Sequence, residues 1–168
     1  MKTKAILVIL VLGSAIQAQQ ANTQTPEQQH CAMMKRGDVG MGFSHEKTTH
    51  HFVLLKDGGA IQVSVNDPKD DASRDQIRMH LSHIAKMFSE GNFDTPMFIH
   101  DTTPPGVPTM EKLHSEIRYQ YDQTDTGAKI MIATANLKAL QAVHEFLRFQ
   151  IDEHRTGDST EVSNTGMK

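Results

Sequence analysis

The feature that most constrains this fold is a turn signal, Asp57-Gly58, between two runs rich in β-branched and aromatic residues. An Asp-Gly pair is typical of a tight hairpin turn, because glycine accepts a positive φ. The pairs that this loop predicts are Leu54–Ile61, Phe52–Val63 and His50–Val65. Side chains alternate along a strand, so we expect His50 to face the core with Phe52 and His51 to face away from it.

A helix and two shorter elements are expected after this hairpin. Residues 73–76 form a capping-box pattern that opens a helix ending near Ser89. Its apolar stripe is Ile77, Leu81, Ile84 and Phe88. The apolar run at residues 93–100 favours an extended segment, and Pro108 suits the first turn of a short helix that ends near Glu116.

The same order, hairpin and then helix, recurs in the second half of the chain. Alternating residues predict a hairpin over residues 117–134, and Asn136 is a suitable cap for a final helix over residues 137–155. The simplest architecture is an α+β fold in which two β-hairpin–helix units form a four-stranded antiparallel sheet with two long helices on one face. We place this single domain at residues 42–157.

The first residues have the pattern of a secretory signal peptide over residues 1–18. Lys2 and Lys4 precede an apolar run at residues 5–16, too short for a membrane span of about 20 residues. Cleavage near Ala18 predicts export to the periplasm or the medium. The sequence has no second apolar run, so we expect no membrane-spanning segment. We expect a flexible segment over residues 19–41 and a disordered tail over residues 158–168.

Charge and cysteine content exclude several classes of protein. Removing Lys2 and Lys4 reduces the 17 basic residues to 15 against 20 acidic residues, a formal charge of −5. A protein with this net negative charge is not expected to have the basic surface that binds nucleic acid. A single cysteine, Cys31, excludes an intramolecular disulfide, so it is a free thiol, a metal ligand or an intermolecular bridge.

The most unusual compositional feature is the content of ten histidines and ten methionines. Imidazole nitrogens suit copper, zinc, iron and nickel, whereas thioether sulfurs select cuprous copper. The mixture therefore predicts a transition-metal site, with copper before zinc. No zinc-finger, C-x-x-C-H or H-E-x-x-H spacing accompanies it, so the signal lies in composition alone.

One candidate group of ligands lies in the helix expected after the first hairpin. Its members are Met79, His80, His83 and Met87. Residues three or four apart share one side of a helix, so two imidazoles and two thioethers could meet one ion. The alternative is structural: His80 bonds a backbone group in the core, and His83 lies in water.

A second candidate group precedes the first hairpin. Its members are His30, Cys31, Met33, Met34, Met41 and His45. Glycines at positions 37, 40 and 42 would let this segment fold around an ion. The alternative is a methionine-rich arm without fixed structure.

Further histidines fall on the expected core faces of other elements. His114 and His144 lie on helical stripes, and His50 lies on the core face of the first strand. Because buried polar groups need partners, these residues form either polar contacts in the core or a converging set of ligands. If His50, His80 and His144 converge, a metal ion or a non-covalent haem becomes tenable.

The sequence therefore favours an exported protein that binds copper through His and Met side chains, for sequestration or delivery. The alternative is a metal-independent binding or assembly module with structural histidines and an unidentified partner. Catalysis has less support, because no G-x-S-x-G motif or phosphate-binding loop occurs. The enzyme candidates that remain are Cys31 and the pair His100–Asp101.

Three stretches of the chain resemble a group of small exported bacterial proteins of unestablished activity. They cover residues 41–59, residues 73–88 (S-R-D-Q-I-R-M-H-L-S-H-I-A-K-M-F) and residues 146–157 (F-L-R-F-Q-I-D-E-H-R-T-G). Some similar proteins carry the label aspartate carbamoyltransferase. The chain has neither an S-T-R-T-R run nor an H-P-x-Q motif, so the resemblance implies no catalytic residues for it.

Overall fold

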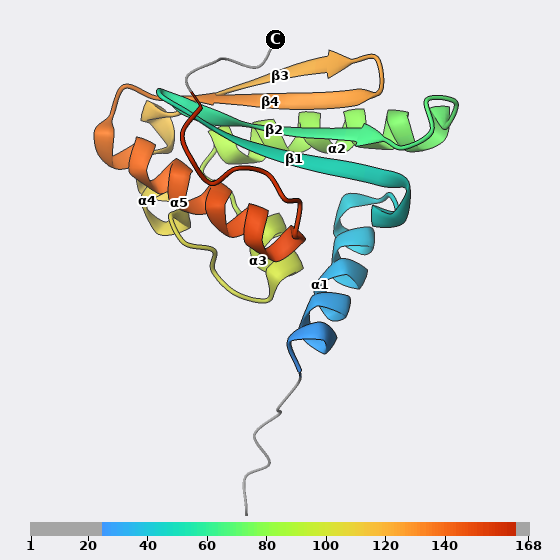
Figure 1. Cartoon of the computed structure of the whole chain (residues 1–168). Coiled ribbons are helices and arrows are strands. Elements are labelled where there is room, and N and C mark those ends of the chain that lie inside the picture. Colours follow the sequence, from blue (N-terminus) through green and yellow to red (C-terminus); the bar gives the residue numbers. More distant parts are fainter. Residues whose placement is uncertain (1–24, 164–168) are drawn as a thin grey trace, which may run out of the picture.

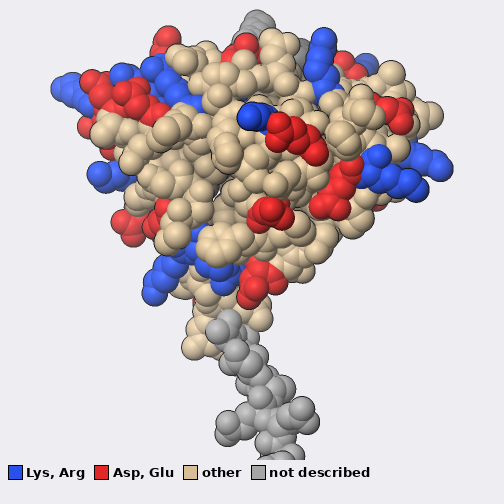
Figure 2. Space-filling view, turned by 180° about the vertical axis from the view of Figure 1, so that it is seen from behind, with Lys and Arg blue, Asp and Glu red and all other residues tan. Residues whose placement is uncertain are grey.

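The computed structural model describes residues 25–163. The expected signal peptide at residues 1–18 lies outside this range, as do residues 164–168 of the expected tail. Within residues 25–163, no helix is long and apolar enough to cross a membrane. On the face drawn in Figure 2, acidic and basic side chains are interspersed, without one large area of a single sign.

Four strands form one antiparallel sheet in the order β1-β2-β4-β3. They are β1 (Thr48–Leu55), β2 (Gly58–Val65), β3 (Arg118–Thr124) and β4 (Gly127–Ala133). Each hairpin pairs two consecutive strands, and the pairing of β2 with β4 joins the hairpins. Two long helices, α2 (Asp71–Ser89) and α5 (Leu137–His154), pack on one face of the sheet (Figure 1). The predicted α+β fold is therefore confirmed.

The first hairpin turns one position earlier than the sequence predicts. The observed pairs are Phe52–Ile61, His50–Val63 and Leu54–Gly59. The loop is thus Lys56-Asp57, and each partner shifts by two residues, which keeps every side chain on its predicted face. This register brings Gly59 into β2 beneath α5, where a Cβ atom would collide with the side chain of Leu147.

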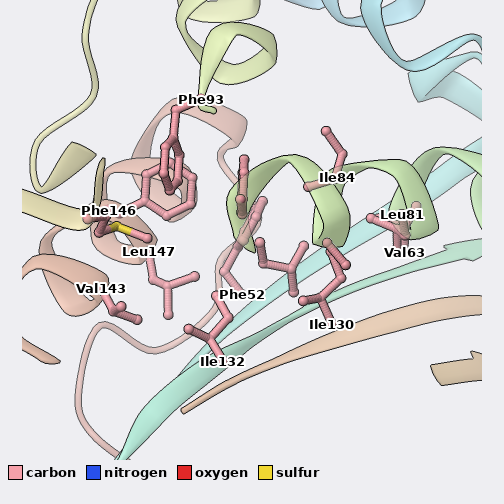
Figure 3. Packing of buried hydrophobic residues seen from close by; sticks show 14 of the residues in the cluster. Phe52, Val63, Leu81, Ile84, Phe93, Ile130, Ile132, Val143, Phe146 and Leu147 are labelled. Atoms are coloured by element: carbon pink, nitrogen blue, oxygen red, sulfur yellow. The ribbon is translucent and has the colours of Figure 1, made fainter. Parts of the chain in front are cut away.

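The core fills the space between the sheet and the two long helices. The side chains labelled in Figure 3 are Phe52, Val63, Ile130 and Ile132 of the strands, Leu81 and Ile84 of α2, Val143, Phe146 and Leu147 of α5, and Phe93. The predicted cap of α5 is present, since the side chain of Asn136 accepts from the amide of Lys138 at 2.9 Å. The cap of α2 is Asp70, which accepts from the amide of Ser73 at 3.0 Å.

Between the hairpin units lie α3 (Asp94–His100), α4 (Val107–Lys112) and the 3₁₀ turn η2 (His114–Glu116). A helix forms at Pro108 as predicted, but it ends at Lys112 and a separate 3₁₀ turn follows up to Glu116. The extended segment predicted for residues 93–100 is wrong. A short apolar run does not distinguish a strand from a buried helix. Here Pro96 lies within the first turn of α3, and the helix ends at Asp101, which has a positive φ of 55°.

The segment preceding the first strand forms a helix, α1 (Pro26–Met41), followed by the 3₁₀ turn η1 (His45–Lys47). The flexible segment predicted up to residue 41 is therefore wrong from residue 26 onward. Thr25 and Gln28 form a capping box. Gly40 lets α1 lie against α3, because a Cβ atom there would come 3.3 Å from Ile99 Cγ1. Packing against a neighbour stabilises a helix whose own pattern is weakly amphipathic.

The tail predicted to be disordered from residue 158 is ordered up to residue 163. The carboxylate of Asp158 accepts from the amide of Phe52 at 2.9 Å and pairs with Nδ1 of His51 at 2.8 Å. Further along, the amide of Ser163 donates to the carbonyl of Leu54 at 2.8 Å. This stretch follows the edge of β1, where a strand has backbone groups free to pair.

Candidate functional site

Four histidines from four different elements line one cavity between the sheet and the helices. They are His50 of β1, His80 of α2, His100 of α3 and His154 of α5. The cavity has a volume of about 70 Å³, roughly the share of two water molecules in the liquid. The rest of its wall is mainly apolar and includes Met41 of α1 and the core residues Phe52 and Phe146. The latter two are labelled among the core side chains in Figure 3.

Three of the four histidines reach the cavity at core-facing positions of their own elements. His50 occupies a core-facing position in the alternation of β1. His80 lies one turn before Ile84 on the buried stripe of α2, and His154 extends the stripe of α5 beyond Ile151. The cavity therefore lies where the histidine positions of these three elements meet.

The imidazole rings form a connected row across the cavity. The ring centroids of His50 and His154 lie 5.5 Å apart with nearly parallel planes, and those of His154 and His100 lie 5.2 Å apart with perpendicular planes. Phe43 packs beside the row, with its centroid 6.1 Å from His50 and 5.6 Å from His80. Aromatic neighbours hold the rings in defined orientations.

The cavity favours the uncharged form of its histidines. Burial lowers the pKa of His50 to about 4, and the imidazole of His80 adds to the effect. Burial also lowers the pKa of His80 to about 4, with His83 as the second cause. The pKa of His154 lies well below 6.5 because of burial and then because of His50 and His100. At neutral pH each ring therefore has one nitrogen lone pair for a ligand.

His100 and Gln150 leave two polar atoms without partners at the cavity wall. Nε2 of His100 donates to Oε1 of Gln150 at 3.0 Å, because a carbonyl oxygen only accepts. Within residues 25–163, Nδ1 of His100 and Nε2 of Gln150 have no hydrogen-bond partner. Burial lowers the pKa of His100, although Gln150 and then Glu153 oppose the shift. Unpaired buried groups of this kind indicate space for a water molecule or a ligand.

The structure brings three of the predicted ligands, His50, His80 and Met41, to this cavity. The predicted convergence does not include His144. Its Nε2–H instead points between two carbonyl oxygens at the β1–β2 turn, those of Leu55 at 2.8 Å and Gly58 at 2.9 Å. The stripe of α5 is long enough to reach both the turn and the cavity, which is why His144 and the cavity lie apart.

The predicted group on α2 divides between the core and the solvent. His80 lines the cavity, but His83 is exposed and Met79 is 70 % exposed. The sulfur of Met87 accepts from the hydroxyl of Thr95 at 3.8 Å. Residues at these spacings spread over about 100° of the helix, so the group crosses the edge of the buried stripe.

The predicted group before the first hairpin also separates, because α1 is a regular helix. Cys31 is exposed, whereas Met33 and Met41 are buried. His45 follows the helix and is held by Asp38, whose Oδ1 lies 2.8 Å from both the amide and Nδ1 of His45. These contacts close the turn after α1 and do not gather the group around one point.

Sequence reasoning did not place His154 or His100 among the candidate metal ligands. A signal for His154 was present, since it lies three residues after Ile151 on the stripe of the final helix. His100 had no such signal, because the run before it was assigned to an extended segment. Both residues gain their place from packing between distant elements.

Within residues 25–163, no three His, Cys, Asp or Glu side chains are arranged to hold a metal ion. Comparisons with protein-family models, curated proteins and solved structures found no match. The protein is therefore described by its own fold and by its cavity. It is an α+β protein with a small apolar cavity lined by uncharged histidines.

Proposed function

We propose that this is an exported protein that binds a transition-metal ion, cuprous copper first, in the histidine-lined cavity. Its role is to sequester or deliver the ion. One observation carries the proposal: four histidines with lowered pKa values and the thioether of Met41 line the same small cavity. Imidazole and thioether together suit a soft ion. Export is inferred from the leader pattern at residues 1–18.

Copper is preferred to zinc and haem on grounds of coordination and size. Zinc sites in proteins use three or four protein ligands, and no such set of His, Cys, Asp and Glu is in place within residues 25–163. A cuprous ion, in contrast, is selected by thioether ligands, so two imidazoles and Met41 form a donor set suited to it. The centroids of His50 and His154 are 5.5 Å apart with nearly parallel planes, so binding of the ion requires the rings to turn until a nitrogen lone pair of each points at it. A haem exceeds a cavity of about 70 Å³.

The test is an anaerobic cuprous titration with elemental analysis of the purified protein, without a histidine tag. We expect one ion per wild-type chain and loss of binding in His50→Leu/His154→Leu, because leucine fills similar space without a donor. His83→Ala, on the solvent side of α2, serves as the matched control and keeps the ion. Binding no stronger than in the double variant, or loss in His83→Ala, contradicts the proposal.

A metal-independent binding module is the second candidate, and the unpaired amide nitrogen of Gln150 favours it. A small neutral molecule with an acceptor oxygen would satisfy this buried donor among the apolar walls. This candidate predicts a melting temperature unchanged by copper or by chelator, whereas bound copper raises it. The same thermal measurement therefore separates the two functions.

A further inference from the structure

A wider polar pocket of about 320 Å³ lies beside the histidine cavity. It is bounded by α1, the end of α3 and α5, and its walls include Met33, Arg36 and Glu153. His100 lines both this pocket and the cavity. The ring of His100 is thus the shared wall between the two spaces.

Two residues with soft donor groups line this pocket, Met33 and His100. Met33 lines the pocket with a thioether and is only 2 % exposed. Nδ1 of His100 has no hydrogen-bond partner within residues 25–163, because Gln150 engages the other ring nitrogen. The His100 ring contacts that of His154, with centroids 5.2 Å apart. A thioether and an imidazole thus line the pocket, and the imidazole of His100 also contacts a second imidazole that lines the cavity.

The charged groups of the pocket are suited to a cation. Oε2 of Glu153 lies 3.9 Å from Nδ1 of His100, and Asp101 adds a second carboxylate. The guanidinium of Arg36 also lines the pocket, and its Nε donates to the carbonyl of Ile99 at 2.8 Å. Burial lowers the pKa of His100, and the charge of Arg36 adds to this effect. Carboxylates at a pocket mouth raise the local concentration of cations.

We propose that this polar pocket is the entrance by which a cuprous ion reaches the histidine cavity. Met33 and His100 are the first protein ligands of the ion, and His154 receives it from His100. Each transfer forms a bond to the next donor as the bond to the previous donor breaks, and copper stays cuprous throughout. The inference rests on the proposed copper binding and adds the route and its ligands.

The first test measures the rate of copper uptake from a weak cuprous chelate under anaerobic conditions. Met33→Leu removes the thioether but keeps a similar volume. We expect uptake about tenfold slower, the scale on which loss of a supporting group weakens metal sites, with wild-type stoichiometry and affinity at equilibrium. Met34→Leu, a partly buried neighbour in α1 outside the pocket lining, is the matched control and loads at the wild-type rate.

A second test blocks the pocket by volume alone. Ala32 lines the pocket, so Ala32→Phe narrows it and slows uptake, whereas Val39→Phe on the exposed side of α1 does not. If both Ala32→Phe and Met33→Leu take up copper at the wild-type rate with normal equilibrium binding, the entrance proposal is wrong while the proposed copper binding stands. That result would indicate entry past His80. Absence of copper binding in the wild-type protein overturns the proposed function and the entrance together.

Discussion

The role of each histidine in this protein depends on the groups that its ring contacts. His144 lies against two carbonyl oxygens at a turn, whereas His45 and His51 each pair with a carboxylate. Among residues 25–163, His50 and His154 have neither kind of partner, and their rings lie nearly parallel in an apolar cavity. The first three are engaged by the fold, so the cavity pair is the one with lone pairs available for an ion.

His144 provides a prediction about stability that is separate from metal binding. His144→Leu leaves the carbonyls of Leu55 and Gly58 without this donor, so we expect the free energy of unfolding to fall by about 1–3 kcal/mol, measured by urea denaturation. Copper stoichiometry stays at the wild-type value. The exposed control His83→Leu changes stability by less than about 0.5 kcal/mol. Loss of copper in His144→Leu would place this residue in the site after all.

The sequence predicts which face of an element a residue occupies better than it predicts what the residue meets there. Strand alternation placed His50 toward the core, and the helical stripe placed His80 there too. The same reasoning placed His144 on a core face, but only the packed structure shows that this part of α5 meets a turn. Partners of a buried polar group come from distant segments, which periodicity does not identify.

At the scale of elements, α1 is the part most dependent on its neighbours. It buries only Met33, Gly37 and Met41, whereas α5 buries a continuous stripe. Two polar contacts connect α1 to the rest of the protein. Arg36 donates a hydrogen bond to the carbonyl of Ile99, and Glu27 near the start of the helix forms an ion pair with Arg155 at 3.1 Å. An exposed ion pair contributes little to stability. We therefore expect α1 to open more readily than α2 or α5.

Copper binding should stabilise α1 if Met41 is a ligand. We expect amide hydrogen exchange in α1 to slow by roughly tenfold with cuprous copper, since an ion bound to Met41 joins the helix to the core. Met41→Leu should keep the fold and lose this protection, while Met34→Leu should keep it. Equal protection in Met41→Leu would show that the thioether does not hold the ion.

Two elements were not predicted because their signals are short-range or weak. The pattern at residues 93–100 is too short to show a helical period, and α1 has few apolar positions. The capping box at Thr25 and Gln28 was visible in the sequence but lay in a polar segment read as flexible. Both helices are stabilised by contact with each other and with the core, which a local pattern does not contain.

The whole molecule joins two hairpin–helix units through one strand pair, that of β2 with β4. The four-stranded sheet and its two helices followed from the sequence, because each unit has a turn, two alternating runs and one long apolar stripe. The order of strands and the cavity did not follow. Both depend on how the two units pack together, and the cavity takes its histidines from both units and from α3 between them.

The cavity histidines His50 and His80, which are half-buried and largely desolvated, predict that the whole fold loses stability in mild acid. The pKa of His50 is about 4 in the folded protein and 6.5 for an ordinary histidine, so the unfolded chain binds more protons between these values. Stability is therefore full above pH 6.5 and falls as the pH drops toward 4, by about 3 kcal/mol for His50 alone. His80 has the same sign.

Urea midpoints measured from pH 7.5 to pH 4.5 test this expectation. Burial opposes ionisation of Asp158, but the amide of Phe52 and neighbouring donors lower its pKa below 3.8. Protonation of Asp158 therefore destabilises the fold only at pH values below the measured range. His50→Leu should give a flatter profile than the wild type, and His83→Leu, which removes an exposed ring, should follow the wild type. A wild-type midpoint independent of pH would mean that the histidines are protonated as easily in the folded protein as in the unfolded chain. The cavity would then not keep its imidazoles neutral for binding an ion.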